Sequence, residues 1–417
     1  MSQLQFATDR EIDLSDLDGF WAQSEEAVAS SFAWLRDNDP IRRFEEPSYK
    51  VIPTGRGFWA ITRYDDILEV SKNPEVFASG DGIGIPDQPV ELNELFGSMI
   101  AMDDPRHARL RRIVAGGFTP RMLARLEETV QTVAAEIVDE VGGSGSCDFV
   151  TEIAAALPLR IICDMMGIPP SEYEFVFDRT NVILGAGDPE FVPPGQSKLE
   201  AFISAGQDLN EVMVELATER RKRPTDDLTS VLLAAEVDGE RLSAGELGAF
   251  FNLLVAAGNE TTRNAISWGL VYLTQHPEQR RIWQDNFEAV APTAVDEIVR
   301  FASPVIHMRR TVRADTVVGG QPMAAGDKVV LFYNSANRDE DAFDDAQSFD
   351  VTRQPNNHVG FGGPGPHFCL GAHLARREIT VMFRELFDRL PTIEATDEPV
   401  RLRSNFIHGI KHLPCAF

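Results

Sequence analysis

The longest helix that the sequence predicts constrains the fold more than any other segment. It begins at Ser243, where Ser243 and Glu246 have the spacing of a capping box. It continues to His276-Pro277, over about 33 residues or roughly 50 Å. Such a helix must cross the whole core of a domain, and it is not a membrane span, because polar residues interrupt its apolar run. These residues are Asn252, Asn259, Glu260, Arg263 and Asn264.

Helical periodicity dominates the rest of the chain, which predicts a mainly α fold with a smaller β region. The exception is 48–64, where two β-rich runs flank Gly55-Arg56-Gly57 and predict a hairpin. A short helix is expected after it, then a long loop over 79–100 and a surface turn over 142–148.

Charge and cysteine content narrow the class of protein. The net charge of −26 repels phosphate backbones and anionic membranes, so nucleic acid is not an expected partner. Only four cysteines occur in 417 residues, and the acidic N-terminal segment lacks the blocks of a signal peptide. No run of about 18 apolar residues is present. We therefore expect a cytoplasmic protein with no membrane span.

Cys369 lies in the stretch HVGFGGPGPHFCLGAHLARREI, residues 358–379, directly before a predicted helix that ends at Pro391. A phosphate-binding loop is one reading, but Pro364 and Pro366 remove backbone donors. A zinc site with His367 and His373 is another, but structural zinc needs four ligands, and no second Cys/His pair is visible. A buried structural cysteine is the simplest alternative.

A haem thiolate is the remaining reading of Cys369. The N-terminus of the following helix supplies positive potential that stabilises a thiolate. Glycines let backbone amides approach the sulfur and leave a flat surface for a macrocycle. A thiolate ligand also pushes electron density to haem iron and favours O–O cleavage.

With these residues, the chain resembles the cytochrome P450 haem-thiolate monooxygenases along almost its whole length. The family's loop has Phe, glycines, a basic residue and Cys-x-Gly, which match Phe361, Gly365, His367, Cys369 and Gly371. One departure is that Phe361 lies eight residues before the cysteine, where seven is common. The resemblance implies a single domain over 1–417, with haem b between the long helix and the Cys-bearing loop, and Cys369 as axial ligand.

Two further motifs fit the same family. Glu297 and Arg300 lie one turn apart, and the resemblance implies that they form a buried structural anchor with Arg353. In AAGNETT, residues 256–262, the family binds dioxygen and delivers protons. The matching positions are Ala257 and Gly258 for cofactor contact and Glu260 and Thr261 for catalysis. The acid is Glu, where Asp is commoner.

Haem propionates need cations, and the resemblance implies four partners. His107 and Arg111 are four residues apart on one helical face, and Arg309 and His367 match two further positions. Each alone could be a solvated surface residue, but together they follow the family's order.

The substrate pocket implied by the resemblance is mostly apolar. Its expected residues are Ile85, Phe96, Met99, Leu254, Val255, Val305 and Phe406. Stretches such as FGSMIAMDDPRHARLRRIVAGGFTP and ASPVIHMRRT look most like mycobacterial-type methyl-branched lipid ω-hydroxylases. Sterol side-chain and terpenoid hydroxylases are the alternatives.

The expected partners are an apolar or lipid substrate, O2, and a ferredoxin with its NAD(P)H-dependent reductase, since no flavin or nicotinamide module is visible. A haem sensor or carrier without turnover is an alternative of another class. It would explain Cys369 but not the Glu260-Thr261 pair.

Overall fold

The computed structural model describes residues 12–46, 55–87, 98–118, 120–185, 188–237 and 239–417. Its α-helices are α1 (Glu25–Asn38), α2 (Tyr64–Lys72), α4 (Arg106–Gly117), α5 (Pro120–Val141), α6 (Ala156–Met166), α7 (Tyr173–Leu184), α8 (Lys198–Lys222), α9 (Leu228–Ala234), α10 (Ala244–Gln275), α11 (Pro277–Asp285), α12 (Phe287–Ala302), α13 (Tyr333–Ala336) and α14 (Ala372–Arg389). Short helical turns are η1 (Ser98–Ala101), η2 (Phe149–Ala154), η3 (Pro170–Glu172) and η4 (Pro189–Phe191).

The strands are mostly short. They are β1 (Ile41–Phe44), β2 (Phe58–Ile61), β3 (Phe77–Ala78), β4 (Ser146–Asp148), β5 (Glu236–Val237), β6 (Glu240–Arg241), β7 (His307–Val312), β8 (Thr316–Val318), β9 (Gln321–Met323), β10 (Lys328–Phe332), β11 (Glu394–Ala395), β12 (Val400–Arg401), β13 (Ile410–His412) and β14 (Pro414–Ala416). The mainly α fold with a smaller β region is confirmed.

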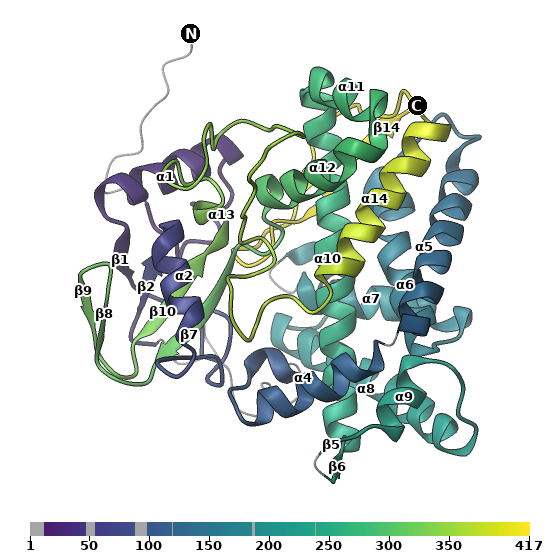
Figure 1. Cartoon of the computed structure of the whole chain (residues 1–417), viewed down its shortest axis with the longest axis horizontal. Helices are drawn as coiled ribbons and strands as arrows, with labels where there is room; N and C mark the ends of the chain where they lie inside the picture. The colour runs from purple at the N-terminus through teal and green to yellow at the C-terminus, as the bar shows by residue number, and fades with distance from the viewer. Residues whose placement is uncertain (1–11, 47–54, 88–97, 119, 186–187, 238) are drawn as a thin grey trace.

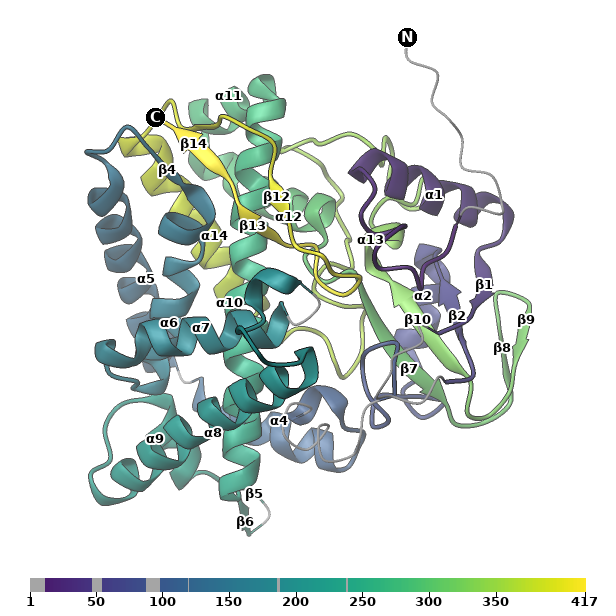
Figure 2. The same cartoon turned by 180° about the vertical axis from the view of Figure 1, so that it is seen from behind.

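The long helix predicted from Ser243 is α10, a continuous helix of 32 residues. The hydroxyl of Ser243 accepts from the Glu246 amide, and the Glu246 carboxylate accepts from the Ser243 amide, which confirms the capping box. Figures 1 and 2 show α10 running through the middle of the helices, with α14 toward one viewer and α7 and α8 toward the other.

Two glycines let neighbouring helices approach α10 closely. A Cβ at Gly258 would lie 2.7 Å from Ile162 Cδ1 of α6, and one at Gly269 would lie 2.7 Å from the Phe383 ring of α14. Glycine inside a helix costs about 1 kcal/mol against alanine. Here the missing side chains allow tight packing, and the helix stays unbroken at Gly258.

A five-stranded sheet forms the second part of the fold, in the order β1-β2-β10-β7-β3. Alternate residues of β10 face opposite sides, as strand geometry requires. Val330 and Phe332 pack in one apolar cluster with Phe32 of α1. Val329 and Leu331 pack in another that includes residues of α2. The sheet is therefore covered by α1 on one face and α2 on the other (Figure 1).

The predicted hairpin is correct for its second strand only. β2 pairs with β1, at Ile41–Phe44, upstream of the β-rich run that was expected to be its partner. Residues 47–54 of that run lie outside the described residues. The sequence of β1, IRRF, places two arginines between its buried ends, so it lacks the apolar alternation that identifies a strand.

Two loop predictions have mixed outcomes. In the predicted loop over 79–100, residues 79–87 form turns and Ser98–Ala101 a short 3-10 helix, and 88–97 lie outside the described residues. The predicted turn over 142–148 ends early, because Ser146–Asp148 form β4, which pairs with the C-terminal β14. A partner so distant in sequence leaves no local signal.

The predicted structural anchor is present. Arg300 Nε lies 2.7 Å from Glu297, and both side chains are fully buried. Arg353 Nε is 3.1 Å from the same carboxylate. Among the described residues, no helix is long and apolar enough to cross a membrane.

Candidate functional site

The loop that carries Cys369 is closed by its own backbone. The Cys369 amide donates to the Phe361 carbonyl at 3.0 Å, and the Phe368 amide donates to the Gly365 carbonyl at 3.2 Å. The Phe361 ring lies under the Arg376 guanidinium, 4.4 Å from its carbon. These contacts fix the ends of the loop against the first turns of α14.

The glycines of this loop allow it to lie against the end of α2. A Cβ on Gly365 would be 2.3 Å from the Ser71 carbonyl oxygen, and one on Gly363 would be 2.4 Å from the Ser71 hydroxyl. Such distances are too short for real side chains. Gly365 is therefore required by the packing of the loop on α2.

The thiol of Cys369 is accessible to solvent although protein surrounds it closely. Burial raises the pKa of this thiol, whereas the Gly371 and Ala372 amides and the charges of Arg111 and Arg376 lower it. The space that leaves Cys369 accessible is called the opening beside Cys369 below. The described residues contain no cluster of three or more His, Cys, Asp or Glu that could hold a metal ion.

The middle of α10 also has accessible surface inside the fold. Ala257 is exposed and Leu254 and Thr261 are half-buried, whereas Val255 and Glu260 are buried. The spacing of 254, 257 and 261 places the accessible residues on one helical face. Thr261 Oγ1 donates to the Ala257 carbonyl at 2.8 Å.

Glu260 and Thr261 have different partners. The Glu260 carboxylate is fully buried, forms an ion pair with Arg263 and accepts from Asn264 Nδ2 at 2.9 Å. Arg263 also donates to Asn181 of α7 at 2.8 Å, and Asn264 accepts from the Ile410 amide of β13 at 3.1 Å. Glu260 is thus tied to two elements flanking α10.

Three of the four predicted propionate partners, His107, Arg111 and His367, gather near the Cys369 loop, where the neighbouring cation from β7 is Arg310 and not the predicted Arg309. The rings of His107 and His367 have centroids 4.3 Å apart, and Arg111 donates to the Phe368 carbonyl at 2.7 Å. Arg309 is buried and pairs with Asp87 at 2.8 Å. His107 Nε2 and Arg309 Nε are buried with no hydrogen-bond partner among the described residues.

The electrostatics of this group favour an anion. Burial, followed by the charges of Arg310, His107 and Arg111, lowers the pKa of His367 to about 3. Burial also lowers the pKa of His107, although Asp104 opposes the shift. Arginine charges therefore dominate this part of the site at neutral pH.

The predicted substrate residues differ in exposure. Ile85 and Val255 are fully buried and Met99 nearly so, whereas Leu254, Val305 and Phe406 are half-buried. Val305 forms a β-bridge with Ile407, which places it beside the turn that carries Phe406. Phe96 lies outside the described residues.

Comparison with known proteins decides the family. A family model for cytochrome P450 matches residues 39–407. The chain belongs to the cytochrome P450 family.

Individual relatives agree with this assignment. The chain is 51% identical to the methyl-branched lipid omega-hydroxylase of Mycobacterium tuberculosis, over 97% of this chain and 94% of that protein. It is 40% identical to the steroid C26-monooxygenase of Rhodococcus jostii, over 91% and 80% of the two chains. The structure of Mycobacterium marinum cytochrome P450 CYP268A2 in complex with pseudoionone has a TM-score of 0.92 and 45% identity, covering 99% of this chain and 100% of that one.

Family membership makes this protein a haem-dependent monooxygenase whose iron is bound by a cysteine thiolate. The described residues fit that cofactor. The Cys369 thiol is accessible, an exposed alanine interrupts the buried surface of α10, and His107 Nε2 is buried with no hydrogen-bond partner among the described residues. The cytochrome P450 fold predicted from the sequence is confirmed.

Three polar residues of this cytochrome P450 were not predicted to belong to the site. Arg263 and Asn264 hold Glu260, and their spacing of three and four residues from it could have indicated this. Glu378 of α14 is buried and hydrogen-bonds with Thr262, the residue after Thr261. A carboxylate on the apolar face of α14 was its only sequence signal.

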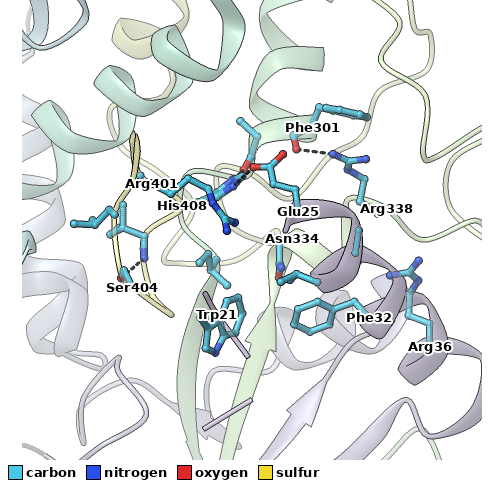
Figure 3. Close-up of a pocket in the computed structure, with 17 residues that line it drawn as sticks. Trp21, Glu25, Phe32, Arg36, Phe301, Asn334, Arg338, Arg401, Ser404 and His408 are labelled. Carbon is cyan, nitrogen blue, oxygen red and sulfur yellow. Dashed lines mark hydrogen bonds and ion pairs between the residues drawn. The ribbon is translucent and has the colours of Figure 1, made fainter. Parts of the chain in front are cut away.

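A separate cavity of about 90 Å³ lies between α1, the end of α12 and the turn after β12 (Figure 3). Inside it, His408 Nε2 lies 2.7 Å from Glu25, and Arg338 donates to the Phe301 carbonyl at 3.1 Å. Its described lining includes neither Cys369 nor any residue of α10. This cavity is therefore distinct from the haem site.

The pH dependence of stability should reveal the buried Glu378 carboxyl. Burial raises the pKa of Glu378 from 4.5 to about 8, so the folded protein keeps it protonated while the unfolded chain ionises. Its stabilising contribution is complete below pH 4.5 and is lost as pH rises toward 8. A difference of one between the folded-state and unfolded-state pKa corresponds to about 1.4 kcal/mol. The free energy of unfolding can therefore fall by a few kcal/mol over this pH range.

The matched variant is Glu378→Gln, which keeps a neutral group able to bond Thr262. We expect wild-type stability relative to this variant to fall between pH 4.5 and 8 in denaturant titrations of the haem-loaded protein. Parallel profiles for the two proteins would contradict a neutral Glu378.

Proposed function

We propose that this cytochrome P450 hydroxylates the terminal carbon of methyl-branched fatty acids or related lipids. The observation that carries the proposal is 51% identity, over 97% of the chain, to a methyl-branched lipid omega-hydroxylase. Because the similarity extends over almost the whole chain, it includes the distant segments that form the proposed substrate pocket. Sterol side-chain hydroxylation is the second candidate, because relatives named steroid C26-monooxygenase are 40% identical.

The proposed haem site uses the residues that surround the opening. Cys369 is the axial ligand, since its thiol is accessible and its neighbouring amides and arginines favour the thiolate. The cations near the loop bind the propionates, and His107 Nε2, which has no hydrogen-bond partner among the described residues, supports this role. The proposed cofactor contacts are His107, Arg111, Arg309, His367, Gly365, Phe361, Ala257 and Gly258.

Thiolate-bound haem supplies the activation of O2 and the insertion of one oxygen atom into a C–H bond. The protein must deliver protons to the opening while excluding bulk water. Thr261 is on the accessible face of α10, and its hydroxyl oxygen can accept a hydrogen bond while it donates to Ala257. Glu260 is a fixed carboxylate one residue away, positioned by Arg263 and Asn264.

Electrons come from outside the chain in this proposal. A ferredoxin, reduced by an NAD(P)H-dependent reductase, is the proposed donor, and the cytoplasm is the proposed compartment. The absence of a recognisable flavin motif in the sequence and its few cysteines support these two points.

Terminal hydroxylation requires a shaped channel, because terminal methyl C–H bonds are harder to break than internal ones. A hundredfold preference needs about 2.7 kcal/mol in relative barriers, and one buried CH2 contributes about 0.8 kcal/mol. Several contacts must therefore act together. Two half-buried apolar residues are suited to narrowing this channel. They are Leu254 of α10 and Val305, which lies beside the turn that carries Phe406. The other proposed substrate contacts are Ile85, Phe96, Met99 and Val255.

The first prediction concerns the ligand. Cys369→Ser should lose the strongly red-shifted ferrous–CO absorption band, because a serine oxygen cannot replace a thiolate donor. Cys147→Ser, which changes another accessible cysteine, should keep the band. A Cys369→Ser protein with an unchanged band would show that the iron ligand is another residue.

The second prediction concerns proton delivery by Thr261. Thr261→Val keeps the side-chain shape without the hydroxyl, so alcohol formed per NAD(P)H should drop roughly tenfold or more, with hydrogen peroxide rising. Thr261→Ser keeps a hydroxyl and should retain most of the coupling. Substrate binding, followed by the ferric spectrum, should be similar in all three proteins. Equal coupling in the valine and serine variants would remove this role.

The third prediction concerns regiochemistry. With ferredoxin, reductase and NADPH, an ω-1-methyl fatty acid should yield mainly the terminal alcohol and should be preferred over its straight-chain isomer, because the branch fills the channel. Mass spectrometry of the products gives both results, and omission of ferredoxin is the control. Mainly subterminal alcohols, or faster turnover of a sterol in the same assay, would favour the second candidate.

A further inference from the structure

Cys147 and Cys415 are distant in the sequence but lie side by side in the fold. Cys147 is on β4 and Cys415 on β14, and the two residues are directly paired in the antiparallel ladder. Their sulfur atoms are 3.4 Å apart. Backbone bonds on both sides of the pair, from the Phe149 amide to the Leu413 carbonyl and from the Phe417 amide to the Gly145 carbonyl, hold the two strands in register.

We propose that Cys147 and Cys415 form a reversible disulfide when the protein meets a hydroperoxide. Directly opposed residues of antiparallel strands have Cα atoms about 4.5–5.5 Å apart, and disulfides need about 4.4–6.8 Å. The S–S bond is about 2.05 Å, so small side-chain rotations suffice to close the gap. Two thiols that only fill space in a core would be the simpler explanation, and the experiment below separates the two.

The environment of the pair makes it more reactive than Cys163, and in the haem-loaded protein Cys369 is the proposed iron ligand. The Cys147 thiol donates a hydrogen bond that lowers the pKa of Cys415. Cys147 is half-buried, so a small oxidant can reach the pair. Cys163 is fully buried, and burial raises the pKa of its thiol. Thiolate character and access together determine which cysteine reacts with peroxide.

The chemistry balances with hydrogen peroxide, which incomplete coupling of an oxygen-consuming monooxygenase releases. One thiolate attacks peroxide, the O–O bond breaks, and a sulfenic acid and one water form. The second thiol then attacks the sulfenic sulfur, the S–O bond breaks, and a second water leaves as the S–S bond forms. The two thiols lose two electrons and two protons, and peroxide gains them.

The disulfide would fasten the C-terminal strand to the middle of the chain. β14 follows β13, whose Ile410 amide bonds to Asn264 of α10 beside Glu260. A bridge between residues 268 positions apart also closes a very long loop in the unfolded chain, which favours the folded state. Disulfides of reducing compartments are generally transient and redox-responsive, as this one would be.

The test uses the haem-loaded full chain equilibrated with mixtures of oxidised and reduced dithiothreitol, then quenched with acid, alkylated and digested without reduction. We expect the peptides containing Cys147 and Cys415 to be joined, with Cys163 alkylated. In a separate turnover reaction, peroxide released by incomplete coupling should produce the same joined peptides, and added catalase should suppress them. The oxidised protein should unfold several degrees higher in wild type and in Cys163→Ser, with no such shift in Cys147→Ser.

Joined peptides that appear only after denaturation would overturn the proposal. Separate oxidation of each cysteine to sulfinic acid, or an unfolding midpoint that does not respond to oxidation, would also do so. Neither outcome depends on the lipid substrate, so the proposed hydroxylase function is tested independently.

Discussion

The carboxylate of Glu297 holds in place the segments without regular secondary structure that lead to Cys369. It accepts hydrogen bonds from Arg300, Arg353 and the Asp350 amide, all inside the protein. The two arginines also donate to backbone carbonyls between residues 337 and 348, so a segment with little regular structure gains fixed partners. Asn337 then accepts from the Val359 amide at the start of the cysteine loop. Burying ions is expensive unless every group is satisfied. The hydrogen bonds of this network offset the cost of burying the charged groups. Through Asn337, they also connect α12 to the loop that ends at Cys369.

Two buried carboxyl groups at residues 256–262 of α10 and next to them have different partners. Glu260 forms an ion pair with Arg263 and accepts a hydrogen bond from Asn264. Glu378 hydrogen-bonds with Thr262, and burial raises its pKa to about 8, so it stays neutral at pH 7. Both side chains are buried, and the Arg263 cation lies beside Glu260, whereas a neutral hydroxyl lies beside Glu378.

The sequence predicts the parts of this fold that follow a local period or a spaced motif. α10 with its capping box, α14 before Pro391 and the Glu297–Arg300 pair are all confirmed, since each depends on residues within a few turns. Long-range pairing is what the sequence misses. β1 was not recognised, and neither was the pairing of β4 with β14, because their partners lie far along the chain. The same limit hid the Cys147–Cys415 contact. For the site, the sequence predicts which residues gather near Cys369, but the directions in which Glu260 and Thr261 point depend on Arg263, Asn264 and Ala257.

The glycines of this chain illustrate how one residue type answers different constraints. In α10, Gly258 and Gly269 are needed because side chains of α6 and α14 occupy the space that a Cβ would fill. In the cysteine loop, Gly365 is needed because the backbone of α2 is only 2.3 Å from that position. From the sequence alone, these glycines would be expected to provide backbone flexibility or contact with a macrocycle. Their neighbours show instead that close packing requires glycine at these three positions. The shape of the haem site therefore depends on the close helix contacts around α10 as well as on the residues that face the site.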